Sequence, residues 1–179
     1  MTLLTRFCLA ISALLILSAT SAAQDHYKII TGHKRAQNVT TVKMAPVKIS
    51  GDKDKYHSLH ISPSFSYPGH QATVPEHIHF ELQTIVKGKL RVDLYVVFIV
   101  DGETIFLSSS RRGVERPVPG RRWMGELLVF RMPYKMFLKM AAAKAVAVKL
   151  DAVRFEFGET PMQALRDFAK LIDAPVEMN

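Results

Sequence analysis

The stretch that decides the fold is residues 90–110, LRVDLYVVFIVDGETIFLSSS. Its two halves have the alternating pattern of strands that face a core on one side. Between them stand Asp101 and Gly102, and an aspartate followed by glycine readily adopts the positive backbone angles of a type I′ turn. The sequence therefore predicts a tight β-hairpin that turns at Asp101 and Gly102.

The segments around this hairpin predict further strands with one solvated face. In residues 56–67, YHSLHISPSFSY, the side chains of Leu59, Ile61 and Phe65 share one face, and the serines and His60 lie on the other. The same alternation occurs in VTTVKMAPVKI (39–49), MGELLVFRM (124–132), AVAVKL (145–150) and VRFEF (153–157). The last two segments predict a second hairpin around Asp151 and Ala152.

Two helices are predicted late in the chain. Pro133 opens a short helix in YKMFLKMAAAK (134–144), because proline is well suited to the start of a helix. The C-terminal helix is predicted to begin at Thr160 as N-cap, with Gln163 as its capping-box partner. Its apolar stripe is expected to cover an exposed sheet face, and consists of Leu165, Phe168, Ala169 and Ile172.

Roughly seven or eight strands with two late helices predict a mainly β fold. The expected architecture is an antiparallel β-sandwich or open barrel with a short connecting helix and a C-terminal capping helix. Residues 96–172 resemble the C-terminal half of small exported bacterial β-rich proteins of unassigned function. In these proteins a strand ends in an Asp-Gly-Glu turn, a segment that residues 132–157 resemble in the spacing of Met-Pro-Tyr, alanine, valine and phenylalanine follows, and the last helix contains ALRDF. The resemblance covers about half of the mature chain and implies the fold without implying an activity.

The first residues predict an export signal. Arg6 precedes an apolar run at residues 7–17, which is shorter than the ~20 residues that cross a bilayer as a helix, and small residues at 21–23 form a cleavage site. We therefore expect residues 1–23 to be removed and the protein to be periplasmic or secreted, with no transmembrane segment afterwards. Residues 24–37 are expected to be a flexible N-terminal arm, and residues 38–179 a single β-rich domain.

Charge and cysteine content narrow the chemistry. The one cysteine, Cys8, lies in the predicted signal, so a mature chain without it can use neither disulfides nor a catalytic thiol. Loss of Arg6 lowers the formal charge from +8 to +7, which favours anionic partners. Outside the cytoplasm these are acidic glycans, lipopolysaccharide and lipid head groups. Nucleic acid is disfavoured, because the compartment is wrong and aromatic residues are not interleaved with the basic ones.

A first candidate site lies in residues 75–88, PEHIHFELQTIVKG. In a strand, His77, His79 and Glu81 point to one face, and two imidazoles with a carboxylate suit zinc or iron with open coordination positions. If the preceding strand pairs as a symmetric hairpin, His60 lies diagonally from Glu81 and adds a third imidazole. The other interpretation is a solvated strand face whose polar residues bind no metal.

The hairpin register behind this hypothesis is specific. It pairs Ser64 with His79, Ser66 with His77, and His60 with Gln83.

The same stretch resembles the first motif of the cupin family, with Gly69, His77, His79, Glu81 and Gly88 in the motif's order. The resemblance implies a metal-binding protein or a metal-dependent enzyme. The chain departs from the family pattern in two ways. A single residue separates His79 from Glu81, where cupins have three or four, and no histidine follows His79 to act as the later ligand.

A second candidate site is the loop RRGVERPVPGRR, residues 111–122. Its prolines hold the chain extended, and guanidinium groups suit bidentate contacts with phosphate or carboxylate. The alternative is a solvated basic loop that protects a sheet edge from unwanted pairing. The anion-binding candidates are Arg111, Arg112, Arg116, Arg121 and Arg122.

These patterns favour a binding protein over an enzyme. The sequence contains no Gly-x-Ser-x-Gly, no Ser-x-x-Lys and no phosphate-binding glycine loop, so no catalytic residue is assigned. We expect a non-enzymatic domain that binds or scaffolds at the bacterial envelope, prefers anionic partners and needs no cofactor. The alternative is a cupin-like metal protein or enzyme with zinc or iron at His77, His79, Glu81 and His60.

Overall fold

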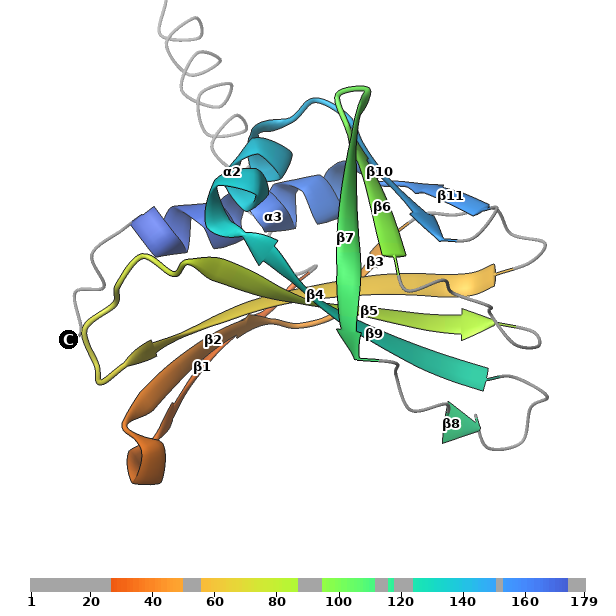
Figure 1. The fold of residues 1–179 in the computed structure, drawn as a ribbon. Helices are drawn as coiled ribbons and strands as arrows, with labels where there is room; N and C mark the ends of the chain where they lie inside the picture. Colours follow the sequence, from red (N-terminus) through yellow and green to blue (C-terminus); the bar gives the residue numbers. More distant parts are fainter. Residues whose placement is uncertain are drawn as a thin grey trace, which may run out of the picture.

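The computed structural model describes residues 27–49, 56–86, 95–111, 116–117, 124–150 and 153–173 (Figure 1). The described strands are β1 (Ile29–Lys34), β2 (Val39–Met44), β3 (Val47–Ile49), β4 (Tyr56–Pro68), β5 (His77–Val86), β6 (Tyr95–Val100), β7 (Glu103–Arg111), β8 (Arg116–Pro117), β9 (Met124–Pro133), β10 (Val146–Leu150) and β11 (Val153–Glu156). The helices are α2 (Tyr134–Ala142), α3 (Glu159–Asp173) and the 3-10 turn η1 (Arg35–Gln37).

The strands form two antiparallel sheets that are joined through β7. The hydrogen-bonded order is β1-β2-β4-β5-β9-β7-β6-β10-β11, with β3 on β4 and β8 on β9. The first part of β7 pairs with β6, whereas only Ser109 and Arg111 pair with β9. β7 therefore links the two sheets: β1, β2, β4, β5 and β9 lie on one side of it in the strand order, and β6, β10 and β11 lie on the other. This confirms the predicted mainly β class with a short connecting helix and a C-terminal helix.

The central hairpin forms as the sequence predicts. Asp101 has φ 47° and Gly102 has φ 87°, and Val100 pairs with Glu103 across the turn. The Asp101 carboxylate also accepts hydrogen bonds from the backbone N–H groups of Lys144 (3.0 Å) and Ala145 (2.9 Å). The turn is thereby fixed to the connection between α2 and β10.

Both predicted helices are present, and one start differs by a residue. α2 begins directly after Pro133, as expected. α3 begins at Glu159, so Thr160 lies inside the helix and is not its N-cap. The reason is that Phe157 is still bonded to the Val146 carbonyl, and the Gly158 carbonyl already accepts a bond from the Met162 N–H.

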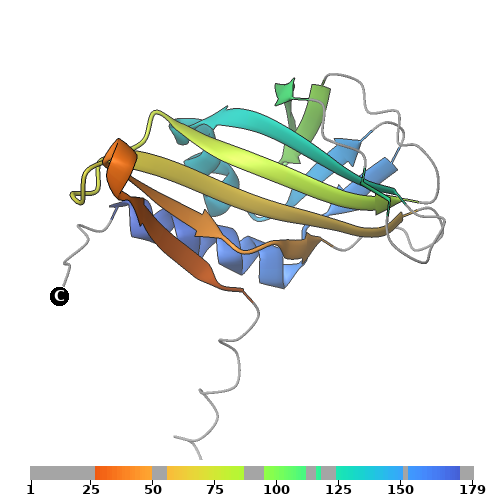
Figure 2. The same ribbon diagram turned by 90° about the horizontal axis from the view of Figure 1, so that it is seen from below.

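The apolar stripe of α3 covers the sheet as predicted. Leu165 and Phe168 are fully buried, and Ala169 and Ile172 are nearly so. Figure 2 shows α3 behind the orange strands β1 to β3 and α2 behind β5 and β9, on the same face of the long sheet. The opposite face of these strands is therefore free of the two helices.

An aromatic cluster joins the two sheets and both helices. Phe80 of β5 and Phe130 of β9 stack with ring centroids 5.3 Å apart, and Phe98 of β6 packs against both rings. Phe137 of α2 contacts Phe80 and also Phe168 of α3. All five rings are fully buried, so this cluster fixes the positions of the strands that carry the candidate site.

The N-terminal part of the domain is more ordered than the sequence suggests. The expected flexible arm was residues 24–37, but Ile29–Lys34 form strand β1, which pairs along its full length with β2. The Tyr27 hydroxyl also hydrogen-bonds to Asp167 of α3. The pairing with β2 is local, because only η1 and Asn38 separate the two strands, whereas the contact with α3 joins distant parts of the chain.

The described residues form eleven strands where the sequence predicted seven or eight. The predicted strand 39–49 is divided at Ala45 and Pro46 into β2 and β3, and β1 and β8 are additional. No helix within the described ranges is long and apolar enough to cross a membrane.

Candidate functional site

The polar face of β5 is the first candidate site. Ile78, Phe80 and Leu82 are fully buried, so the alternating residues His77, His79 and Glu81 lie on the opposite, outer face. This is the face of the long sheet that the helices leave free (Figure 2).

The register between β4 and β5 agrees with two of the three predicted pairs. Ser64 pairs with His79 and His60 pairs with Gln83, as the symmetric hairpin predicted, and Ser62 pairs with Glu81. The described ladder between β4 and β5 ends at Ser64, so the predicted pair of Ser66 with His77 is not part of it.

The neighbouring strands add cations directly opposite these positions. Lys43 of β2 lies opposite Ser64, Lys48 of β3 lies opposite His60, and Arg131 of β9 lies opposite His79. We refer to the resulting surface as the cationic sheet face, which consists of Lys43, Lys48, His60, His77, His79, Glu81 and Arg131.

The one carboxylate of the cationic sheet face is already paired. Lys43 Nζ lies 2.8 Å from Glu81 Oε2 and reaches across β4 to do so. Beneath it, Ser62 is fully buried and its hydroxyl donates to the Met44 carbonyl. Ser62 therefore differs from the solvated serine that the alternation predicted, because it is buried against the last residue of β2, just before the division between β2 and β3.

Burial and neighbouring cations act together on two histidines. Burial, then Arg131 and then His77, lower the pKa of His79. Burial, then Lys48, lower the pKa of His60. Both effects disfavour the imidazolium, so these rings are neutral at neutral pH and gain charge only in acid.

We expect stability to fall on acidification because of these two rings. A histidine with a lowered pKa binds its proton less readily in the folded protein than in the unfolded chain, so the free energy of unfolding declines as pH drops below the usual imidazole range. The double variant His60→Gln, His79→Gln should therefore show a shallower loss of thermal midpoint between neutral pH and pH values below both imidazole pKa values. Ser64→Ala, on the same face, should keep the wild-type slope. An unchanged slope in the double variant would contradict this assignment.

His77 has a different environment. Its Nδ1 is covered and has no hydrogen-bond partner within the described residues. The nearest carboxylate oxygen, Glu76 Oε2, lies 3.7 Å away, which is too far for a hydrogen bond. Since Glu76 is exposed, a small rotation of its side chain would let the two residues pair.

The described residues contain no group of three or more histidine, cysteine, aspartate or glutamate side chains placed to hold a metal ion. His60, His77, His79 and Glu81 are all described, so the sheet does not gather them into a ligand set. Glu81 also turns toward Lys43 instead of His79.

The arginine loop joins the same sheet at β9. The backbone of Arg111 pairs with Val129, which pairs on its other side with Glu81 of β5. Arg116 lies in β8 and pairs with Gly125. Arg112, Arg121 and Arg122 lie outside the described residues. The two sequence candidates, far apart in the chain, are therefore attached to adjacent strands of one sheet.

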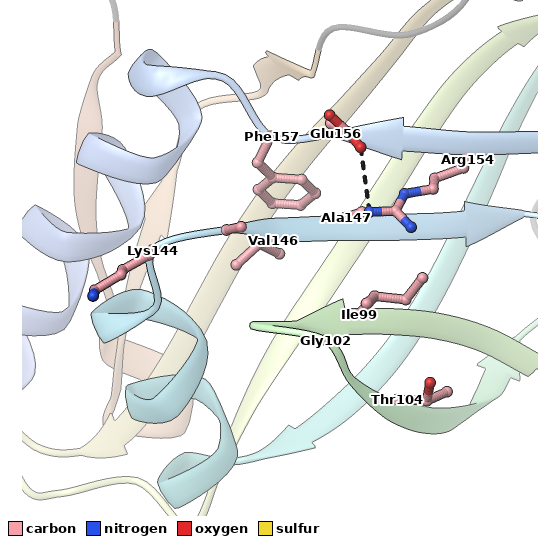
Figure 3. A pocket seen from close by; sticks show the side chains of 10 residues that line it. Ile99, Gly102, Thr104, Lys144, Val146, Ala147, Arg154, Glu156 and Phe157 are labelled. Carbon is pink, nitrogen blue, oxygen red and sulfur yellow. Dashed lines mark ion pairs between the residues drawn. The ribbon is translucent and has the colours of Figure 1, made fainter.

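A further surface was not predicted from the sequence. A cavity of about 410 Å³ opens where β6, β10 and β11 lie side by side, lined by Ile99, Ala147, Glu156 and Phe157 among others (Figure 3). On β6 and β7, Tyr95 and Phe106 are 58% and 69% exposed. A signal was present, because residues 95–100, YVVFIV, are apolar at every position and so supply apolar side chains to both faces of β6.

No known protein family, curated protein or solved structure matches this chain.

Proposed function

We propose that this protein is an exported, non-enzymatic domain that binds or scaffolds at the bacterial envelope and prefers anionic partners. The contact surface is the cationic sheet face together with the arginine loop at residues 111–122. The observation that carries the proposal is the charge balance of that face. Its only carboxylate, Glu81, is paired with Lys43, whereas Lys48 and Arg131 have no ion-pair partner within the described ranges.

Three features support an anionic partner at this surface. The face is open and is not covered by α2 or α3 (Figure 2). Arginine and lysine on a sheet surface can approach several phosphate, sulfate or carboxylate groups at once. Arg111 and Arg116, which lie within the loop at residues 111–122, pair through their backbones with β9, the strand that carries Arg131.

Export supports the same proposal. The signal-like segment at residues 1–23 would direct the chain to a compartment whose abundant polyanions are acidic glycans, lipopolysaccharide and lipid head groups. A non-enzymatic role is supported by the lack of a recognisable nucleophile motif in the sequence.

The test is binding to immobilised dextran sulfate over a range of salt concentrations. We expect the double variants Lys48→Gln, Arg131→Gln and Arg121→Gln, Arg122→Gln each to weaken binding by about tenfold at low salt. The slope of log affinity against log salt should become shallower by about two, because two contacts no longer release counterions.

The matched control is Lys34→Gln, Arg35→Gln, which removes the same charge from the end of β1 and from η1. It should bind nearly as well as the wild type. Binding that does not depend on salt, or an equal loss in all three double variants, would show that a specific basic surface is not responsible.

A further inference from the structure

The sheet formed by β7, β6, β10 and β11 has an outer face with exposed aromatic residues. Tyr95 and Phe106 are 58% and 69% exposed, and Val97 and Ile99 are half-buried between them and β10. Exposed large apolar residues gathered in one place commonly mark a contact surface. We call this surface the outer hairpin face and define it by Tyr95, Val97, Ile99, Phe106, Ala147, Lys149, Arg154 and Glu156, with Lys144 at its margin.

Strand register places cations next to the apolar residues. Val97 lies opposite Phe106 on one side and opposite Lys149 on the other, and Lys149 lies opposite Arg154. Each transverse row of a sheet shares one face, so two apolar side chains are followed by two basic ones. The next row contains Ile99, Ala147 and Glu156.

Among the residues that the structure describes, the carboxylates around the outer hairpin face are already engaged. Asp101 accepts the backbone N–H groups of Lys144 and Ala145, and Glu103 pairs with Lys139 of α2. Glu156 Oε1 lies 3.2 Å from Arg154, as Figure 3 shows. The ammonium groups of Lys144 and Lys149 are exposed and have no ion-pair partner in the part of the chain that the structure describes.

The cavity of about 410 Å³ adds room beside these cations. Ile99 and Phe157 give it apolar walls, and Lys144 stands at its margin (Figure 3). The small side chain of Ala147 lies between them. A group with an anionic head and an apolar body matches this combination.

We propose that the outer hairpin face binds the surface of an anionic phospholipid bilayer. Tyr95 and Phe106 enter the interfacial region, and Lys144 and Lys149 contact head-group phosphates. The charge of the face selects this partner, because an apolar patch bordered by unpaired ammonium groups complements a surface that is apolar below and anionic above. This inference rests on the proposed preference for anionic partners and names one of them.

Two independent contributions to the binding free energy add up, one from the aromatic residues and one from the lysines. Aromatic side chains gain free energy in the membrane interface because the ring leaves water, and tyrosine keeps its hydroxyl hydrated there. Each lysine near an anionic lipid surface contributes about fivefold in affinity. Neither term alone holds a protein firmly, and together they give reversible binding that depends on lipid charge.

The experiment is sedimentation of the full chain with vesicles. One set contains equal parts phosphatidylglycerol and phosphatidylcholine, and the other contains phosphatidylcholine alone. We expect binding to the first set only. Tyr95→Ser, Phe106→Ser should reduce it by about tenfold or more, and Lys144→Gln and Lys149→Gln by about fivefold each. The matched charge control is Lys34→Gln, Arg35→Gln, which should bind like the wild type.

A parallel dextran sulfate measurement separates this inference from the proposed function. Retained binding to dextran sulfate in the aromatic variant supports the inference, because the polymer offers no apolar interface. A wild-type protein that binds dextran sulfate but not vesicles overturns the inference alone, and one that binds neither overturns both. Equal vesicle binding by the aromatic variant and the wild type also overturns it. So does a concentration-dependent dimer that the aromatic variant abolishes, since the face would then join two copies.

Discussion

Phe80→Ala is expected to lower the free energy of unfolding by about 3–5 kcal/mol. Phe80 is fully buried on the inner face of β5, stacks on Phe130, and contacts Phe98 and Phe137. Its loss leaves a cavity where the two sheets and α2 meet, and close packing prevents the neighbours from filling it. Since a domain's whole stability is about 5–15 kcal/mol, the variant should lie near its folding limit.

Chemical denaturation followed by circular dichroism measures this effect. The matched control is Phe106→Ala, which removes the same ring from a position that is 69% exposed and should change stability by less than about 0.5 kcal/mol. Similar losses for the two variants would show that the aromatic cluster does not hold the sheets together. His77, His79 and Glu81 lie on the same strand as Phe80. Unfolding of the Phe80→Ala variant therefore also removes the proposed anion-binding face, so anion binding should decrease as the variant unfolds.

Asp101→Ala is expected to cost about 2 kcal/mol, a large effect for an exposed residue. Two causes act together. The carboxylate loses the N–H groups of Lys144 and Ala145, and alanine is strained at φ 47°, where aspartate and asparagine are tolerated. The central hairpin would then lose its attachment to the connection between α2 and β10.

Two companion variants separate these causes by thermal unfolding. Asp101→Asn keeps one acceptor oxygen and tolerates the positive φ, so we expect a loss below about 1 kcal/mol. Asp101→Gly relieves the backbone strain but removes the acceptor, so its loss should lie between those of the asparagine and alanine variants. If all three variants are equally stable, the contact does not stabilise the fold.

The elements of the fold were predictable because their signals are local. The turn at Asp101 and Gly102 requires positive φ at two adjacent residues, and the dipeptide itself indicates it. The apolar residues of α3 recur at helical spacing within its fifteen residues, and they are buried as expected. Predictions that depended on exact ends were less accurate, as at Thr160, since a helix start is set by which backbone groups the preceding strand still uses.

The candidate site was predictable only in part. Alternation was enough to place His77, His79 and Glu81 on one face of a strand, and a symmetric hairpin was enough to pair His60 with Gln83. These local patterns could not indicate that Lys43 forms an ion pair with Glu81. Lys43 is nearly forty residues away in the chain, and the register of its strand β2 is set by long-range pairing. The metal hypothesis therefore depended on partners that only the assembled sheet could reveal.

By itself, the sequence determined the mainly β class, the turn at Asp101 and Gly102, the pairing of β10 with β11 around residues 151–152, which lie outside the described part of the chain, and the amphipathic α3, because each follows from the spacing of neighbouring residues. The tertiary structure alone decided which polar faces meet. It added β1 to the sheet, brought Arg111 and Arg116 to β9, paired Glu81 with Lys43, and left Tyr95 and Phe106 exposed beside Lys149. The physical reason is that side-chain periodicity fixes the face of each strand, whereas strand order and register, set by packing of the whole core, fix its neighbours.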